Sequence, residues 1–285
     1  MRFRTEIEII HPGQHITAEN RLVSVGSCFS QAIGNRLLEC GQHITVTPMG
    51  VLFNPYSIAK VLEYGLDNKM FTQEDLFRDD LGVYHALDFE SRRQNEDSES
   101  LLNVLNEDFS KFSNTLSEAD CWLVTFGTAW CFRHKPTGSI VGNCHKLPDS
   151  QFERALYSVS DIIDIWRPLL QKAPRVIFTV SPVRHLNDGL HGNTLSKARL
   201  HLAIEQLCKL CSNAEYFPAY EALNDDLRDY RFYADDLRHP SNMAEEYIFE
   251  LFCKTYFNAG TQKILEERRR NFKHLNHRPI INKIN

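Results

Sequence analysis

The sequence predicts an α/β fold, a three-layer α/β/α sandwich around a mostly parallel five-stranded sheet. Apolar runs of strand length alternate with amphipathic helical stretches along the chain. The runs are almost continuously apolar, which is typical of parallel strands covered by helices on both faces. A chain of 285 residues can bury a large core as one domain. Five β/α units in succession favour a doubly wound, flavodoxin-like sheet over a barrel.

The strands are expected where apolar runs of four to six residues occur. In chain order they are Leu22–Val25, Ile44–Thr47, Trp122–Phe126, Val176–Val180 and Tyr216–Tyr220.

Helices are expected between the strands, and the first two carry clear boundary signals. After the first strand, an apolar stripe predicts a helix that stops at Gly41. The stripe consists of Phe29, Ile33, Leu37 and Leu38. Asn54-Pro55 predicts an N-cap and a first-turn proline for the second helix, with Gly65 as its stop. Further helices are expected over Gln151–Leu170, Leu195–Leu210, Asn242–Tyr256 and Gln262–Phe272, the last forming a C-terminal helical extension.

Two segments interrupt this alternation within a single domain that spans 1–285. Residues 66–118 are polar and predict an insertion over one sheet edge that ends in a helix. Residues 129–148 predict a hairpin that turns at Pro136-Thr137-Gly138. Residues 275–285 are expected to form a loose tail.

The composition is that of an ordinary globular protein, with 42% hydrophobic and 24% charged residues. A net charge of -5 gives no reason to expect a nucleic-acid partner. No apolar stretch approaches the about 18 residues that a membrane span needs. No apolar segment of a secretory signal follows Met1, and the eight cysteines lack framework spacing, so free thiols in the cytoplasm are expected.

Polar motifs follow the carboxyl ends of the predicted strands, where ligands bind in an open α/β sheet. In strand order these residues are Ser27, Gly50, Thr128, the pair Arg184 and His185, and the pair Asp236 and His239. Their shared position matters more than any one motif, because parallel strands end at the same edge. The sequence therefore predicts one site at this edge.

Ser27, Asp236 and His239 supply the groups of serine-based acyl chemistry. A serine nucleophile needs a base to remove its proton, and a histidine base needs an acid to hold its tautomer. Asp236 precedes His239 by three residues, so one tight loop can carry both, although Asp235 is a rival for the acid. Ser27 lies at a helix start, where free N–H groups face a developing oxyanion, but a plain N-cap is the alternative. The expected oxyanion donors are the N–H groups of Ser27 and Gly50, unless Gly50 is only a turn glycine.

Taken together, these motifs resemble the GSCFA family of bacterial proteins, a branch of the SGNH (GDSL-like) hydrolase superfamily. The matching segments run nearly end to end: Gly26-Ser27-Cys28-Phe29, Gly50-Val51-Leu52-Phe53-Asn54-Pro55, Thr125-Phe126-Gly127-Thr128-Ala129-Trp130, Asn143-Cys144-His145-Lys146, Thr179-Val180-Ser181-Pro182-Val183-Arg184-His185, Ser196-Lys197-Ala198, and Tyr220-Glu221 through Asp229-Tyr230-Arg231-Phe232-Tyr233 to His239-Pro240. The resemblance implies that Ser27 is the nucleophile, that Asp236 and His239 belong to the last block, and that Gly50 is the oxyanion glycine.

The resemblance also exposes a departure from the superfamily pattern. Its third block is normally Gly-x-Asn-Asp, and the asparagine side chain donates to the oxyanion. In this chain Ala129 stands at that position, so the donor is missing. Asn143, Asn54 and Thr128 are the candidates to replace it. Without a substitute the rate would fall by about 100- to 1,000-fold.

Further polar residues are expected at the same edge. His145, Lys146, Arg184, His185 and Lys197 are candidates to bind an anionic or sugar-like substrate. In the alternative interpretation, Arg184 and Lys197 form structural ion pairs with Asp188, Asp225 or Glu221. A zinc site formed by Cys144, His145 and His185 lacks ligand spacing, so no metal and no cofactor is predicted.

The sequence therefore predicts a serine-dependent acyl-ester hydrolase or O-acyltransferase. Its expected substrate is a short acyl ester, such as an acetyl ester, of a carbohydrate or small molecule, and the reaction passes through an acyl-enzyme. A binding or regulatory protein of the same fold with weak catalysis is the alternative, since Ala129 removes one donor. A metal-dependent hydrolase that uses the His145 region is a second alternative.

Overall fold

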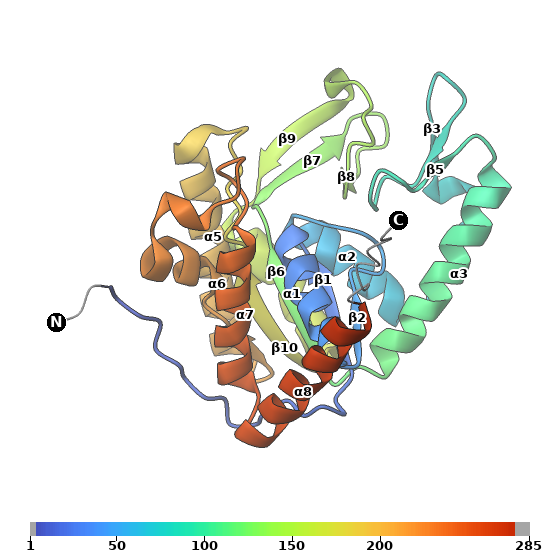
Figure 1. Ribbon diagram of the computed structural model, residues 1–285. Coiled ribbons are helices and arrows are strands. Elements are labelled where there is room, and N and C mark those ends of the chain that lie inside the picture. Colours follow the sequence, from blue (N-terminus) through green and yellow to red (C-terminus); the bar gives the residue numbers. More distant parts are fainter. Residues whose placement is uncertain (1–3, 277–285) are drawn as a thin grey trace, which may run out of the picture.

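The computed structural model describes residues 4–276 and shows a three-layer α/β/α sandwich (Figure 1). The central sheet is parallel throughout, in the order β11-β10-β6-β1-β2. Its strands are β1 (Leu22–Gly26), β2 (Ile44–Val46), β6 (Cys121–Phe126), β10 (Arg175–Val180) and β11 (Ala214–Tyr216). Numbered among themselves, these five strands follow the order 2-1-3-4-5, which is the doubly wound flavodoxin-like arrangement. The predicted fold class is confirmed.

Helices cover both faces of this sheet (Figure 1). One face packs against α2 (Pro55–Leu66), α3 (Ser98–Ser117), α4 (Val159–Lys172) and α5 (Gly189–Leu210). The other packs against α1 (Cys28–Glu39), the short α6 (Ala219–Glu221), the π-helical turn η3 (Ala222–Leu227), α7 (Asn242–Tyr256) and α8 (Ala259–Asn276). Along β6, Trp122 and Val124 enter the first core and Cys121 and Leu123 the second. This alternation explains why the strands read as continuously apolar.

The first two helices begin where the sequence predicts. Asn54 accepts a hydrogen bond from the N–H of Ser57 at 2.8 Å and caps α2, whose first residue is Pro55. The predicted stop at Gly65 is wrong, because α2 continues to Leu66. A Cβ added to Gly65 would lie 2.3 Å from the Leu116 side chain, so this glycine allows α2 and α3 to approach closely.

Residues 152–156 form a strand rather than the start of the predicted helix 151–170. This strand, β9 (Phe152–Leu156), pairs with β7 (Trp130–His134), which also pairs with β8 (Ile140–Val141) in a three-stranded antiparallel sheet. The predicted hairpin is thus present, with a third strand added. Helix α4 begins only after Ser158, which forms a capping box with Asp161.

The fifth strand of the central sheet ends earlier than predicted. The N–H of Phe217 still donates to the carbonyl of Phe178 at 2.8 Å. Pro218 has no N–H to continue the ladder, and α6 begins at Ala219. The three later helices occur as expected, although α5 begins at Gly189 and α8 spans Ala259–Asn276.

The segment 66–118 contains a small sheet followed by a long helix. The sheet comprises β3 (Phe77–Arg78), β4 (Tyr84–His85) and β5 (Gln94–Asn95). Short 3-10 turns occur at η1 (Gln73–Asp75), η2 (Asp149–Gln151) and η4 (Tyr230–Phe232). Helix α3 buries Leu105, Phe109 and Phe112 in the main core, so it belongs to the helical layer. Most of the expected tail, 277–285, lies outside the described residues.

The eight cysteines are all free thiols. No helix within residues 4–276 has the length and apolar character needed to cross a membrane.

Candidate active site

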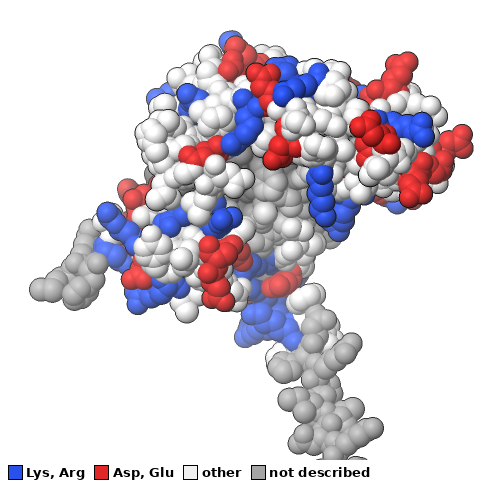
Figure 2. Space-filling view, turned by 90° about the horizontal axis from the view of Figure 1, so that it is seen from above, with Lys and Arg blue, Asp and Glu red and all other residues white. Residues whose placement is uncertain are grey.

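A cavity of about 490 Å³ lies at the carboxyl edge of the sheet. Segments from seven parts of the chain line it, including Cys28, Asn54, Thr128, Asn143, Arg154, Arg184, His185 and His239. Seen from above in Figure 2, the molecule is hollowed near its middle, and basic and acidic side chains are mixed around the hollow. The predicted convergence of polar residues on one edge therefore occurs for most of them.

Asp236 and His239 form a hydrogen-bonded pair on one loop. Nδ1 of His239 lies 2.6 Å from Oδ2 of Asp236, while Oδ1 accepts the N–H groups of Arg238 and His239 at 2.9 and 3.0 Å. The hydrogen bond from the ring, followed by those from the two N–H groups, holds the pKa of Asp236 well below its ordinary value. An ionised carboxylate at Nδ1 favours the tautomer with its proton there, which leaves Nε2 with the free lone pair that a general base needs. Asp236, not its rival Asp235, occupies the acid position.

Ser27 lies at the N-cap of α1 and is only 2% exposed. Its hydroxyl does not cap the helix, and within residues 4–276 it has no hydrogen-bond partner. No hydrogen bond joins Ser27 to His239 in this part of the chain. Cys28, the next residue, lines the cavity, and burial raises the pKa of its thiol. The structure thus forms the hydrogen-bonded Asp236–His239 pair, while Ser27 itself does not line the cavity and is buried next to Cys28, which does.

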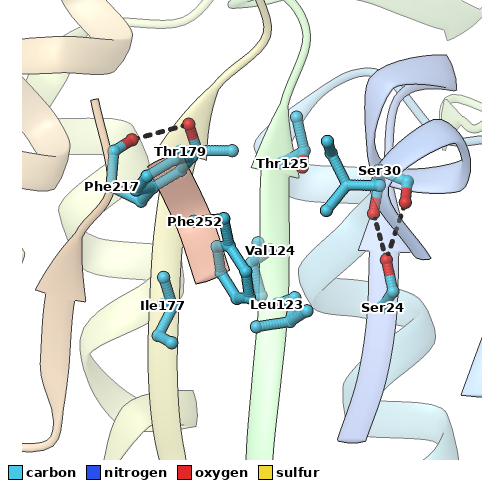
Figure 3. Close-up of a pocket in the computed structure, with 10 residues that line it drawn as sticks. Ser24, Ser30, Leu123, Val124, Thr125, Ile177, Thr179, Phe217 and Phe252 are labelled. Atoms are coloured by element: carbon cyan, nitrogen blue, oxygen red, sulfur yellow. Dashed lines mark hydrogen bonds between the residues drawn. The ribbon is translucent and has the colours of Figure 1, made fainter. Parts of the chain in front are cut away.

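The strand that precedes Ser27 is tied to the helix that follows it. The Ser24 hydroxyl lies 2.6 Å from the Ser30 hydroxyl and 3.0 Å from the Ser30 carbonyl oxygen (Figure 3). These groups border an interior cavity of about 20 Å³, which has room for about one water molecule. Gly26 adopts a φ of +133°, and a Cβ there would lie 2.2 Å from the carbonyl oxygen of Thr125. The corner that carries Ser27 is therefore closely packed.

Gly127, after β6, packs between Ser27 and the start of α2. A Cβ at Gly127 would lie 3.3 Å from Cβ of Ser27 and 3.0 Å from the carbonyl oxygen of Phe53. The Gly127 carbonyl accepts a hydrogen bond from Nζ of Lys197 at 2.7 Å, and the Ser181 carbonyl accepts another at 2.6 Å. Burial lowers the pKa of Lys197 to about 7. Lys197 therefore supports the floor of the site and does not form the ion pair that the alternative interpretation expected.

The two predicted oxyanion donors are engaged elsewhere. The N–H of Ser27 donates to the Thr125 carbonyl at 3.2 Å, as parallel pairing of β1 and β6 continues past β1. The N–H of Gly50 donates to the Thr47 carbonyl at 2.8 Å and closes a turn. Gly50 also lines a separate cavity beside Glu90. The structure corrects this part of the prediction, since neither N–H is available to a ligand in this cavity.

Of the three residues expected to replace the missing asparagine donor, Asn54 and Asn143 each have a side-chain N–H group left unused by the described residues. Oδ1 of Asn54 caps α2 and Oδ1 of Asn143 accepts the N–H of His145 at 2.8 Å. In residues 4–276 Nδ2 has no partner in either asparagine, and both residues line the cavity. Thr128 is less available, because its hydroxyl lies 3.0 Å from the Ser196 hydroxyl and accepts the N–H of Trp130.

The two predicted histidines lie in different places. His145 does not line the cavity: its Nε2 donates to the Phe89 carbonyl at 3.1 Å and its ring packs against His85. His185 does line it, and its buried Nε2 has no partner within residues 4–276. Burial, followed by the Lys197 ammonium, lowers the pKa of His185 to about 4, so this ring is neutral at pH 7.

Sequence reasoning missed three charged residues in the cavity wall. Arg154 forms an ion pair with Asp188, and its guanidinium lies 4.7 Å from the centre of the Trp130 ring. Arg154 belongs to the segment expected to be helical, so no pattern placed it here. Arg238 also lines the cavity, and its position beside His239 was the available signal. Within residues 4–276 no three His, Cys, Asp or Glu side chains are grouped to hold a metal ion.

The GSCFA family model matches residues 21–252. This match covers the five central strands and both parts of the site, and the chain belongs to the GSCFA family. No curated protein and no solved structure matches the chain.

Proposed function

We propose that this member of the GSCFA family is a serine-dependent acyl-ester hydrolase or O-acyltransferase of the SGNH type. The proposal rests chiefly on the hydrogen-bonded Asp236–His239 pair. His239 lines the same cavity as Cys28, the residue that follows Ser27. The proposed substrate is a short acyl ester of a carbohydrate or small molecule. The free cysteines also support a location in the cytoplasm.

In the proposed reaction, Nε2 of His239 accepts the proton of Ser27 as Oγ attacks the acyl carbonyl. Asp236 stabilises the imidazolium that forms. The same proton passes to the leaving alcohol as the C–O ester bond breaks and the acyl-enzyme forms. Water then releases the acid, or an acceptor hydroxyl takes the acyl group.

The oxyanion needs donors other than those first expected. Nδ2 of Asn54 is one candidate donor. Asn54 follows Phe53, and both the Phe53 carbonyl and the Ser27 side chain lie against Gly127. The first N–H groups of α1 are other candidates, since the Ser27 side chain does not cap them. Each such donor typically contributes about 3 kcal/mol to transition-state stabilisation.

The buried hydroxyl must turn toward His239 before it reacts. Hydrogen bonds of this kind often form only once substrate is bound. Such a rotation is favoured because the Ser27 hydroxyl has no hydrogen bond to break with any residue that the structure describes.

The test is covalent labelling with a fluorophosphonate probe, which reacts with activated serines. Wild-type protein should label stoichiometrically, and Ser27→Ala and His239→Ala should abolish labelling. His43→Ala is the matched control, because His43 is exposed at the amino end of β2. Peptide mapping that places the label on another residue would disprove the assignment.

A binding or regulatory protein of the same fold is the second candidate. The observation that favours it is the engagement of both expected oxyanion donors, together with Ala129 in the third block. Folded protein that takes up no label and hydrolyses no ester would support this candidate.

A further inference from the structure

The cavity wall carries an excess of positive charge. Its charged side chains are three arginines and one carboxylate, besides the His239 side chain that Asp236 holds. Asp188 is neutralised by Arg154. His185 is neutral at pH 7, because its pKa is about 4. The surplus therefore belongs to Arg184 and Arg238.

Arg184 is held by aromatic rings rather than by a carboxylate. Its guanidinium carbon lies 4.1 Å from the centre of the Tyr233 ring and 5.3 Å from that of Tyr230. Within residues 4–276 neither Arg184 nor Arg238 forms an ion pair. Stacking uses the face of a guanidinium, so N–H groups along its edge other than the one that bonds the Tyr233 side chain can bind a ligand.

The two arginines are placed on the same side of the cavity as the base. The N–H of Arg184 donates to the carbonyl of Arg238 at 3.1 Å, which ties the loop after β10 to the loop that carries His239. Asp236 is already bound to the His239 ring and to two N–H groups, and Asp235 does not line the cavity. Asp188, on the loop after β10, is paired with Arg154, so no carboxylate on either loop is available to neutralise Arg184 and Arg238 within the cavity.

From this arrangement we infer that the ester is anionic: Arg184 and Arg238 bind a carboxylate or phosphate group on its alcohol part. This inference rests on the proposed function and names its substrate class. The alcohol part is the one placed beside the two arginines, because His239 must return the proton to the leaving oxygen. Guanidinium groups bind both kinds of anion through paired N–H donors.

The experiment compares three aryl acetates with the same acyl group. They are 4-acetoxybenzoate, 4-acetoxyphenyl phosphate and the neutral 4-acetoxybenzamide, with each rate divided by the hydroxide rate. We expect kcat/KM to be about 10- to 100-fold higher for at least one anionic ester. The two anionic substrates distinguish carboxylate from phosphate recognition.

The variants Arg184→Gln and Arg238→Gln should each lower this preference, and the double variant should bring it close to one. Arg231→Gln is the matched control, because Arg231 is exposed on the same stretch of chain and does not line the cavity. A wild-type preference near one, or a preference that survives in the double variant, would overturn the inference.

Binding measurements separate this inference from the proposed function. Titration calorimetry with 4-hydroxybenzoate, phenyl phosphate and 4-hydroxybenzamide needs no turnover. If the protein hydrolyses no ester but binds an anionic probe, and the double variant loses that binding, the anion subsite stands and the catalytic proposal fails. If neither anion binds more tightly than the amide, the subsite is wrong even if Ser27 is labelled.

Discussion

The two halves of the proposed site differ in how they are held. The side chains of Asp236 and His239 are 44% and 45% exposed, whereas Ser27 is only 2% exposed. Yet Nδ1 of His239 is bonded to Oδ2 of Asp236, whereas the buried Ser27 hydroxyl has no hydrogen-bond partner among residues 4–276. The comparison shows that an exposed side chain can still be held in a defined position. Local hydrogen bonds hold Asp236 and His239, whereas packing holds Ser27.

The loop that carries the exposed half is closed by its own backbone. The N–H of Ala234 donates to the His239 carbonyl at 2.8 Å, and the N–H of Leu237 donates to the Ala234 carbonyl at 2.9 Å. Leu237 has a φ of +56°. The acid and base therefore need little from the rest of the molecule, whereas Ser27 depends on β1, β6 and α2 together.

Asp236→Asn should give the largest loss of activity, because it disrupts the Asp236–His239 pair and leaves the surroundings of Ser27 unchanged. We expect kcat/KM for phenyl acetate to fall by about 1,000- to 10,000-fold, because an amide does not hold the His239 tautomer. The melting temperature should change little, since Oδ1 of an asparagine can still accept the N–H groups of Arg238 and His239. Esterase assays and thermal unfolding measure the two quantities. A loss of activity through unfolding would contradict the comparison.

Gly127→Ala should disturb the buried half. The added methyl would press on Ser27 and on the Phe53 carbonyl, both at 3.0 to 3.3 Å. We expect a 10- to 100-fold loss of kcat/KM, roughly what small misplacement of reacting groups costs, and a lower melting temperature. Gly13→Ala is the control, because no atom of the described part of the chain lies within 4 Å of its added Cβ. Full activity in Gly127→Ala would show that the packing there does not position Ser27.

Lys197→Met should give the smallest effect on kcat/KM, and the pH dependence of its stability sharpens the account of the buried half. The pKa of Lys197 is about 7 in the folded state, against about 10.4 in an unfolded chain. Between these values the unfolded state binds more protons, so this group makes the protein more stable as pH rises from 7 to 10. The melting temperature of wild type relative to Lys197→Met should therefore increase over that range. A constant difference would refute the pKa shift.

The fold and the acid–base pair were predictable because their signals are local. Apolar runs predict the strands, Asn54-Pro55 predicts the start of α2, and the three-residue spacing predicts the contact between Asp236 and His239. The oxyanion donors were not predictable, because strand pairing decides that the Ser27 N–H is engaged. Gly65 was predicted to end α2, but it allows α2 and α3 to pack closely. Glycine is favoured at both kinds of position, so the sequence does not distinguish them.

The charged wall escaped prediction for a similar reason. Arg154 reaches the cavity only because residues 152–156 join β7, and nothing in their pattern distinguishes that strand from a helix start. Lys197 was assigned to substrate or to an acidic partner, whereas two carbonyl oxygens satisfy it. Every residue has a backbone carbonyl, so the sequence does not indicate which carbonyl oxygens will accept a side-chain hydrogen bond.

The short Asp-x-x-His spacing has a consequence for how a protease would act on the proposed site. Arg238 is exposed and lies between Asp236 and His239. Cleavage of the peptide bond after Arg238 would therefore leave Asp236 and His239 on different fragments. Trypsin-like proteases cleave after arginine, so one cut there would break the chain between the two proposed catalytic residues, and we expect the sheet and the Ser27 corner to stay folded. Inactivation would then precede any loss of ellipticity.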